Sequence, residues 1–310
     1  MLKDSKIYIA GHQGMVGSAV KRKLEEFGYT NIVTRDLDKL DLTNQSAVKE
    51  FFEKEKPEYV FMAAAKVGGI LANDIYSAEF IYINLMIQNN VIHYAHENGI
   101  KKLLFLGSSC IYPRECPQPM KEEYLMTGPL EQTNEAYAVA KIAGIKMCQM
   151  YRKQYKSDFI SVMPTNMYGP NDNYHPQNSH VFAAFVRRFH EAKENGLKEV
   201  VCWGTGKVYR EFLFVEDCAE GLIFLMNNYS DYEHVNIGTG KDVTIKELAE
   251  TMAEVIGYQG KITWDNSKPD GTPRKLLDVS KINNLGWKYK TDIKQGISES
   301  YKDFLKRFSK

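Results

Sequence analysis

The chain has 310 residues, of which 44% are hydrophobic and 25% charged, a composition typical of a soluble globular protein with one or two domains. Lys and Arg number 40 and Asp and Glu 39, so the net charge of +1 argues against non-specific binding to nucleic acid or to an acidic membrane. No apolar run approaches the roughly 18 residues of a membrane-spanning helix, and five cysteines without a CxxC pair indicate reduced thiols in the cytoplasm.

Short apolar runs alternate with longer helical patterns in the first half of the chain. Strands are predicted at 6–10, 31–34, 59–63, 101–107 and 158–163. Apolar residues at helical spacing follow the first strand and mark two long helices, at about 75–98 and 134–154. Because both faces of these strands are apolar, the pattern predicts an α/β protein with a Rossmann-type, doubly wound parallel sheet.

This alternation fades after Pro164. Residues 165–177 are rich in Asn, Pro, Gly and Tyr and are interpreted as a functional loop. Helices are predicted at 180–195, 217–227 and 245–256, the last with a capping box of Thr244 and Glu247, and strands at 200–203, 210–215 and 234–237. We therefore expect a dinucleotide-binding domain at 1–165 and a smaller α/β substrate domain mainly at 166–310, with segments around 208–240 returning to the first domain.

A glycine-rich turn joins the first strand to the first helix. Gly11, Gly14 and Gly17 form a GxxGxxG pattern within a unit of about 30 residues. Glycines permit a tight turn and let a pyrophosphate approach the backbone N–H groups at the helix start. The alternative is an ordinary strand–helix turn, but the flanking strand and helix favour dinucleotide binding. Arg35, after the second strand, favours the 2′-phosphate of NADP, unless it is a solvated residue beside Asp36 and Asp38.

Tyr137 and Lys141 form a YxxxK pair on the second long helix. Four residues place both side chains on one helix face. A free Tyr has a pKa near 10, and a neighbouring Lys cation is expected to lower the pKa of Tyr137 so that it can give a proton to a carbonyl oxygen. The alternative is a surface pair, since YxxxK alone is common. Its position after a GxxGxxG unit favours catalysis.

A serine-rich turn follows the strand at 101–107. Carboxyl ends of parallel strands are where α/β sheets bind ligands, so Ser108 is a candidate to hold a substrate oxygen, and a capping role is the alternative. Cys110 comes two residues later. On residue type alone, Cys110 is a small buried hydrophobic residue and His180 a neighbour of a helix start.

Several further segments point to one family. They are 63–69 (AAAKVGG), 108–113 (SSCIYP), 163–170 (MPTNMYGP), 178–181 (NSHV) and 268–279 (KPDGTPRKLLDV). Together with the glycine turn and YxxxK, they resemble the extended short-chain dehydrogenase/reductase family, over essentially the whole chain. Within that family they resemble the enzymes that turn a GDP-4-keto-6-deoxy sugar into GDP-L-fucose. The resemblance implies an NADPH-dependent 3,5-epimerase and 4-reductase acting on a GDP-sugar, and a homodimer packed through the two long helices.

The resemblance also implies roles for particular residues. Ser108, Tyr137 and Lys141 would serve reduction, and Cys110 and His180 would exchange protons at C3 and C5 of the sugar. The implied cofactor contacts are Gly11, His12, Gln13, Gly14, Met15, Val16, Gly17, Arg35, Asp41, Leu106, Gly107, Lys141, Pro164, Thr165, Asn166, Met167 and His180. The implied substrate contacts are Arg188, Trp203, Arg210 and Asp270. Their alternatives are an exposed helix face for Arg188, the core for Trp203 and a plain turn for Asp270. No metal site is expected.

The sequence departs from this family at two positions near the expected 2′-phosphate. Gln13 stands where the family usually has Arg, and Leu37 stands where a second Arg often follows Arg35. A charge-assisted hydrogen bond is worth about 1.5–3 kcal/mol, so the preference for NADPH is expected to fall by one or two orders of magnitude.

Three other functions of this fold make different demands on these residues. A sugar-nucleotide 4,6-dehydratase would carry an Asp-Glu pair where Ser109 and Cys110 stand. A 4-epimerase would retain NAD tightly. A non-catalytic dinucleotide-binding regulator would need no proton donor, so the set Ser108, Tyr137 and Lys141 argues against it.

Overall fold

The computed structural model describes residues 1–176, 179–268 and 270–308, so Asn178 and Pro269 of the motifs above lie outside the described residues. Its main sheet has six parallel strands in the order β2-β1-β3-β4-β5-β9. The strands are β1 (Ile7–Ala10), β2 (Ile32–Val33), β3 (Tyr59–Met62), β4 (Lys102–Leu106), β5 (Phe159–Pro164) and β9 (Val235–Ile237). β1, β4, β5 and β9 are buried along their whole length, as expected for strands covered on both faces.

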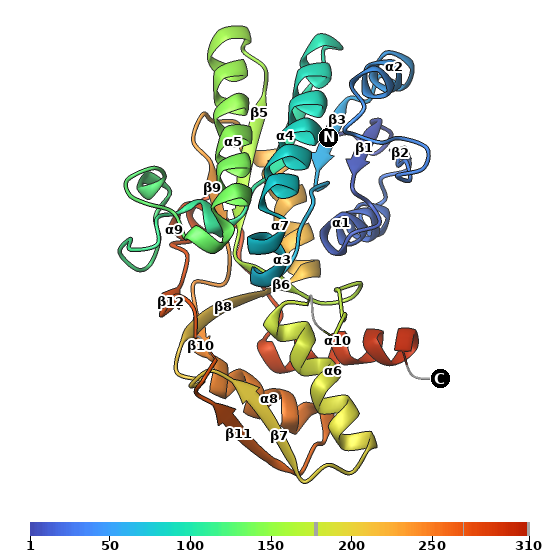
Figure 1. Cartoon of the computed structure of the whole chain (residues 1–310). Helices are drawn as coiled ribbons and strands as arrows, with labels where there is room; N and C mark the ends of the chain where they lie inside the picture. The colour runs from blue at the N-terminus through green and yellow to red at the C-terminus, as the bar shows by residue number, and fades with distance from the viewer. Residues whose placement is uncertain (177–178, 269, 309–310) are drawn as a thin grey trace.

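Helices cover both faces of this sheet (Figure 1). One layer contains α1 (Met15–Glu26) and α7 (Val215–Asn228), which pack against each other. The other contains α2 (Gln45–Glu55), α4 (Ser77–Glu97) and α5 (Glu135–Tyr155), with α4 between its two neighbours. The predicted Rossmann-type α/β fold is confirmed. The short helix α3 (Ile70–Ile75) precedes α4.

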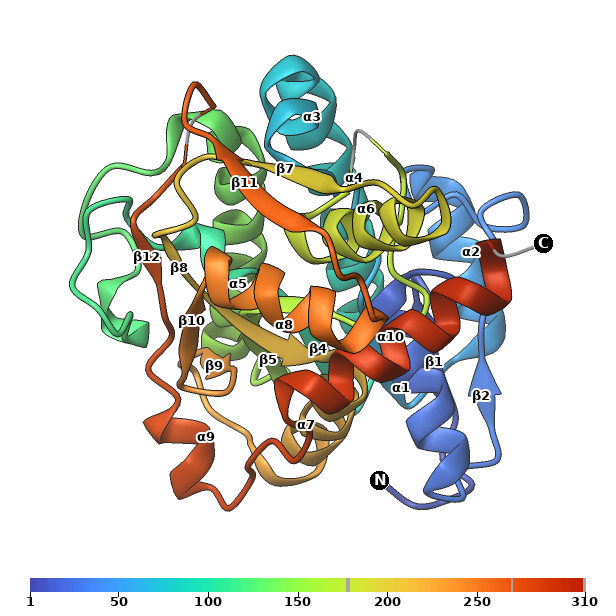
Figure 2. The ribbon, with the colours of Figure 1, turned by 90° about the horizontal axis from the view of Figure 1, so that it is seen from below.

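The smaller unit lies at the carboxyl end of the main sheet (Figures 1 and 2). Its four-stranded sheet contains β6 (Asn166–Tyr168), β8 (Tyr209–Phe214), β10 (Asp242–Thr244) and β12 (Arg274–Lys275), and a parallel pair contains β7 (Glu199–Trp203) and β11 (Lys261–Asp265). Its helices are α6 (Val181–Glu194), α8 (Ile245–Ile256) and α10 (Ile293–Phe308). The segment predicted to be a loop therefore contains a strand, because β6 pairs in parallel with β8, which lies far along the chain.

Two separate hydrophobic cores follow this division. The core of the main sheet includes α7, β9 and the residues Leu277, Ile282 and Trp287 around α9 (Ser280–Asn284). The core of the smaller unit is built from α6, α8, α10 and the strands beside them. These clusters support the proposed two-domain division, whose boundaries remain a prediction. Across the described residues, no helix is long and apolar enough to cross a membrane.

Candidate active site

The glycine turn lies at the point where the strand order reverses. β1 pairs with β2 on one side and with β3 on the other. The carboxyl ends of β1 and β3 therefore flank a crevice of the kind that binds ligands. Gly11 has φ +84°, and a Cβ there would lie 2.7 Å from the backbone of Ala64, just after β3. A Cβ on Gly17 would lie 2.1 Å from the carbonyl oxygen of Gly11. The turn therefore requires glycines, and its cradle before α1 fits the pyrophosphate of a dinucleotide.

The acidic and basic residues after β2 have partners within the protein. Arg35 donates to Glu55 on α2 (2.5 Å) and to the carbonyl oxygen of Thr34 (2.7 Å). Asp41 accepts from the backbone and hydroxyl of Thr43, both at 2.8 Å, in a turn that precedes α2. The structure thus gives both residues a local or structural partner, and their contact with a cofactor remains a prediction.

Tyr137 and Lys141 lie together on the first turns of α5. The ammonium of Lys141 donates to the carbonyl oxygen of Leu106 (2.8 Å) and lies 5.7 Å from the ring centroid of Tyr137. Burial lowers the pKa of Lys141 to about 8 and raises the pKa of Tyr137. The expectation that Lys141 lowers the pKa of Tyr137 is wrong for this structure. The ammonium binds a backbone carbonyl instead of the phenol, so desolvation dominates.

Ser108 and Cys110 lie on the turn after β4, beside this pair. Ser108 caps the short 3₁₀ helix Ser109–Ile111, with its hydroxyl accepting from the backbone N–H of Cys110 at 3.4 Å. Burial raises the pKa of the Cys110 thiol, whereas its hydrogen bond to Ser108 and the charges of Lys275 and Lys141 oppose that rise. The hydrogen bond from Lys141 to Leu106 connects α5 to the strand that carries this turn. Four of the five predicted catalytic residues are thus close in space.

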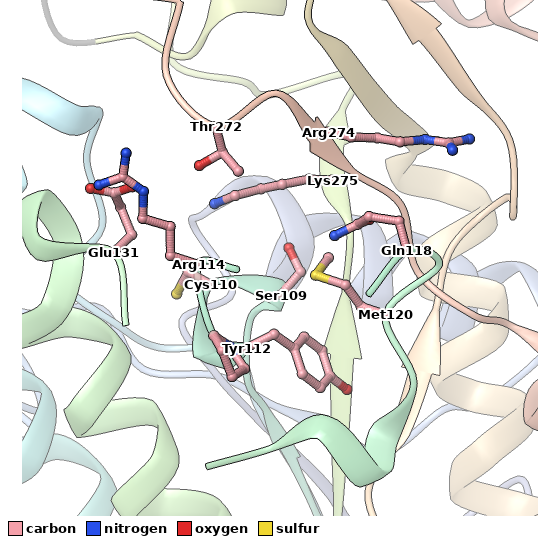
Figure 3. A pocket seen from close by; sticks show the side chains of 11 residues that line it. Ser109, Cys110, Tyr112, Arg114, Gln118, Met120, Glu131, Thr272, Arg274 and Lys275 are labelled. Carbon is pink, nitrogen blue, oxygen red and sulfur yellow. The ribbon is translucent and has the colours of Figure 1, made fainter. Parts of the chain in front are cut away.

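A small pocket opens beside Cys110. It is lined by Ser109, Cys110, Tyr112, Pro113, Arg114, Gln118, Met120, Glu131, Thr272, Arg274 and Lys275. In Figure 3 the Lys275 side chain reaches from β12 across the pocket toward the turn that carries Cys110. Burial lowers the pKa of Lys275, and the charge of Cys110 opposes that shift. The pocket therefore joins the catalytic turn of the main sheet to a strand of the smaller unit.

The residues expected at the nicotinamide end line the ends of β4 and β5. A Cβ on Gly107 would lie 2.3 Å from the sulfur of Met163, so Gly107 packs closely against the end of that side chain. The side chains of Thr165 and Asn166 donate to the backbone carbonyl of Glu211 at 3.3 and 2.8 Å. The sulfur of Met167 lies 3.5 Å from that of Cys218. Pro164 is the last residue of β5, so these residues lie together at the carboxyl end of the main sheet.

His180 stands apart from the other catalytic candidates. It occupies the N-cap position of α6, and the surrounding protein lowers the pKa of its imidazole by desolvation. Among the described residues, no hydrogen bond or ion pair joins His180 to Ser108, Cys110, Tyr137 or Lys141. Its predicted part in catalysis rests on the family resemblance.

The four predicted substrate residues gather around β7 and the turn after it. Arg188 donates to the carbonyl oxygen of Val201 (2.8 Å). Trp203 is 64% exposed, which excludes the core alternative. The guanidinium of Arg210 is close to Asp270, whose charge opposes the lowering of the Arg210 pKa by burial. Asp270 accepts from the backbone (2.7 Å) and hydroxyl (2.8 Å) of Thr205, so its carboxylate has a structural partner.

A family model matches most of this architecture. Residues 7–238 match the NAD dependent epimerase/dehydratase family. The chain belongs to this family. It is 60% identical to "GDP-L-fucose synthase 1" of Arabidopsis thaliana, over 98% of this chain and 94% of that one, and 52% identical to "GDP-L-fucose synthase" of Escherichia coli, over 98% of both.

Two solved structures are similar to this chain along nearly its whole length. A GDP-L-fucose synthetase of Naegleria fowleri bound to NADP has a TM-score of 0.92 and 29% identity, covering 99% of this chain and 96% of that one. A GDP-mannoheptose C4 reductase of Campylobacter jejuni with NADP bound has a TM-score of 0.90 and 42% identity, covering 98% and 99%. This family membership supports a nicotinamide dinucleotide as the cofactor.

The structure also adds residues to this epimerase/dehydratase site that sequence analysis gave no role. Asn171, at φ +66°, donates to the carbonyl oxygen of Gln13 (2.7 Å) and so connects the smaller unit to the glycine turn. The fully buried Glu211 accepts from the backbone N–H groups of Gly240 (2.7 Å) and Leu277 (2.9 Å). An acid within the apolar segment 211–215 was the available signal for Glu211, and Asn171 follows a Gly-Pro turn.

Proposed function

We propose that the chain catalyses the NADPH-dependent 3,5-epimerisation and 4-reduction of GDP-4-keto-6-deoxy-D-mannose to GDP-L-fucose. The observation that carries this proposal is the position of Cys110 two residues after Ser108, beside Tyr137 and Lys141 at the carboxyl end of β4. A reductase alone needs no thiol there. High identity to curated GDP-L-fucose synthases of plants and bacteria supports the same conclusion.

Reduction needs a proton donor and an oxygen-binding group around the C4 ketone. The bound dinucleotide supplies the hydride. In our proposal, Tyr137 donates the proton to O4, and the Ser108 hydroxyl hydrogen-bonds the same oxygen. The raised pKa of Tyr137 keeps its proton in place at neutral pH until the substrate accepts it. Lys141, fixed on the carbonyl oxygen of Leu106, provides positive charge next to the phenol and a donor for ribose hydroxyls.

Epimerisation needs a proton acceptor on one face of the sugar and a donor on the other. Protons at C3 and C5 are acidic because the adjacent C4 ketone turns their removal into an enolate. Burial raises the pKa of Cys110, whereas desolvation lowers the pKa of His180, so at neutral pH one group carries a proton and the other can accept one. We propose that these two residues exchange the protons, with Tyr137 and Ser108 stabilising the oxyanion at O4.

The proposal assigns substrate binding to the smaller unit. Arg210 and Arg188 suit a diphosphate by charge and by their bidentate geometry. The exposed ring of Trp203 offers a surface on which a sugar or a base can pack. Asp270, which lies between β11 and β12, is proposed to contact the substrate. Its hydrogen bonds to Thr205 hold it against the turn that follows β7.

We also propose a homodimer, built through α4 and α5. These two helices pack against each other on one face of the main sheet, and they expose large apolar side chains, among them Tyr82, Val139 and Met150. Exposed apolar residues on adjacent helices favour burial against a second copy. Light scattering at micromolar concentration tests this, and a monomeric mass would overturn it.

The proposed compartment is the cytoplasm. All five cysteines are free, and three of them are buried among apolar residues. Reduced, buried thiols are typical of cytosolic proteins. A fluorescent fusion or cell fractionation tests this location, and enrichment in a membrane or extracellular fraction would contradict it.

A second candidate is 4-reduction of another GDP-sugar without epimerisation. The observation that favours it is the 42% identity to the GDP-mannoheptose C4 reductase of Campylobacter jejuni. The two functions differ in the fate of the hydrogens at C3 and C5, which only an epimerase exchanges with solvent.

The direct test is addition of GDP-4-keto-6-deoxy-D-mannose to the protein and NADPH. The proposal predicts a loss of NADPH absorbance and a product that co-elutes with GDP-L-fucose. Oxidation of NADPH with a product that is the unepimerised 4-hydroxy sugar would instead support the C4 reductase. Absence of NADPH oxidation, both with GDP-4-keto-6-deoxy-D-mannose and with other GDP-4-keto sugars, would overturn both functions.

A further inference from the structure

An acidic residue, Asp36, follows β2 near the position expected for the adenosine ribose. Asp36 lies across from the glycine turn. Its carboxylate accepts a hydrogen bond from the side-chain amide of Gln13 at 2.9 Å. The same oxygen lies 3.1 Å from the imidazole of His12. Two residues of the turn therefore hold the Asp36 carboxylate toward the nucleotide cradle, although Asp36 itself remains half exposed.

The neighbouring cation is turned in another direction. Arg35 donates to Glu55 (2.5 Å) and to the carbonyl oxygen of Thr34, and its guanidinium lies 5.5 Å from the ring centroid of Phe51. Glu55 is partly buried and also pairs with Lys6 at 2.9 Å. Two of these three contacts, those with Glu55 and Phe51, thus hold Arg35 against α2. Leu37, the next candidate position for a cation, is 73% exposed and carries no charge.

An acid after the second strand of such a fold accepts hydrogen bonds from the ribose hydroxyl of NAD, whereas a 2′-phosphate requires a cation. We infer that Asp36, held by Gln13 and His12, is a specificity-determining residue that makes this site bind NADH about as tightly as NADPH. The inference rests on the proposed function, because it concerns the cofactor of the same site. The carboxylate repels the 2′-phosphate of NADPH and accepts from the 2′-hydroxyl of NADH.

The test is calorimetric titration of the full chain with NADPH and with NADH, without sugar substrate. The wild-type dissociation constants are expected to lie within about tenfold of each other. Asp36→Asn is expected to tighten NADPH binding by about tenfold and to leave NADH binding equal or weaker, since only the repulsion of the phosphate is lost. Asp38→Asn is the matched control: it removes the same charge two residues away, from a side chain that is 71% exposed. It should change both constants by less than about twofold.

A second variant adds the missing cation. Gln13→Arg is expected to tighten NADPH binding and to leave NADH binding nearly unchanged, because only the phosphate gains a partner. Wild-type binding of NADPH more than about tenfold tighter than binding of NADH would overturn the inference. Equal effects of Asp36→Asn and Asp38→Asn would overturn it as well.

The outcome is separable from that of the proposed function. The expected ratio of constants, found in a protein that does not turn over the GDP-keto-sugar, would uphold this inference and remove the proposed function. Turnover of the GDP-keto-sugar with NADPH alone, with no binding of NADH, would uphold the proposed function and remove this inference. Binding of neither dinucleotide would overturn both.

Discussion

The two sides of the active site are built differently. On the main sheet, Lys141 is 4% exposed, and its ammonium is fixed between a backbone carbonyl and the ring of Phe105. On the smaller unit, Trp203 is 64% exposed, and the guanidinium of Arg210 donates to the carbonyl oxygen of its own neighbour Tyr209. The first group is held by the core of a six-stranded sheet, and the second stands on short strands and turns.

This difference indicates a division of work between the two sides. Buried groups with fixed partners are preorganised, which favours stabilisation of a transition state. Groups on short strands and turns, among them the exposed Trp203, are available to contact a flexible ligand and contribute binding energy. We therefore expect changes on the main sheet to lower kcat and changes at Trp203 or Arg210 of the smaller unit to raise KM, whereas His180, the proposed proton carrier at the start of α6, belongs with the first group.

The largest effect is expected from Tyr137→Phe. The variant keeps the ring, which packs edge-on against Phe80 with centroids 6.4 Å apart, and loses only the proton donor. General acid catalysis is usually worth about 10²–10⁴ in rate, so kcat should fall by that factor while dinucleotide binding is nearly unchanged. NADPH oxidation and a dissociation constant measured on the same preparation check both parts. Wild-type turnover in the Phe variant would remove Tyr137 from the mechanism.

The next effect separates epimerisation from reduction, and it concerns Cys110 after β4 and His180 at the start of α6. Cys110→Ser raises the pKa of the group at this position far above neutrality, so uptake of solvent deuterium at C3 and C5 without NADPH should fall by about 10² or more. His180→Asn should have the same consequence. Cys116→Ser is the matched control, since Cys116 is also partly buried and its pKa is also raised by burial. Full deuterium uptake by both the Cys110 and His180 variants would return these residues to a structural role.

A change on the smaller unit should act on KM instead. Arg210→Ala removes the guanidinium proposed to bind the diphosphate, and a charge-assisted hydrogen bond is worth about 1.5–3 kcal/mol. KM for the GDP-sugar should therefore rise by about one to two orders of magnitude, with kcat changed less than about threefold. Lys207→Ala, which removes an exposed cation from the turn just before β8, is the control. A fall in kcat at unchanged KM would break the proposed division of work.

The smallest effect is a fall of kcat/KM on the alkaline side of its pH profile, which Lys141 is expected to cause. Its pKa is lowered to about 8, so the ammonium loses its proton as the pH rises through that value, whereas the pKa of an ordinary Lys lies near 10.5. Because the cation is the active form, kcat/KM should be insensitive to this group below pH 8 and fall about tenfold per unit well above it. Lys141→Arg should move this fall to higher pH, and Lys153→Arg, on the exposed face of α5, should leave it in place. A flat profile up to pH 10 would exclude the ammonium as the active form.

The parts of the fold that the sequence predicted depend on local pattern. The main-sheet strands were placed to within about two residues, because each is a short buried apolar run between turn residues. The capping box of Thr244 and Glu247 is confirmed at the start of α8, since its hydrogen bonds span only three residues. The glycine turn and YxxxK were found for the same reason.

The parts that the sequence did not predict depend on partners far along the chain. β6 was interpreted as loop because β8, its partner, is distant in sequence. The bond of Asp270 to Thr205 and that of Arg35 to Glu55 likewise join distant residues. These contacts decide whether a charged side chain is free for a ligand. Residue type and spacing therefore predict where the site lies. They do not predict which of its charged side chains are paired within the protein.

One measurement tests the central claim, that a single site performs both epimerisation and reduction. The protein is incubated in D₂O with GDP-4-keto-6-deoxy-D-mannose and NADPH, and the product is analysed by mass spectrometry. We expect GDP-L-fucose carrying two deuterium atoms, at C3 and C5, with the hydrogen at C4 supplied by the dinucleotide. A reduced product without deuterium at either carbon would contradict it.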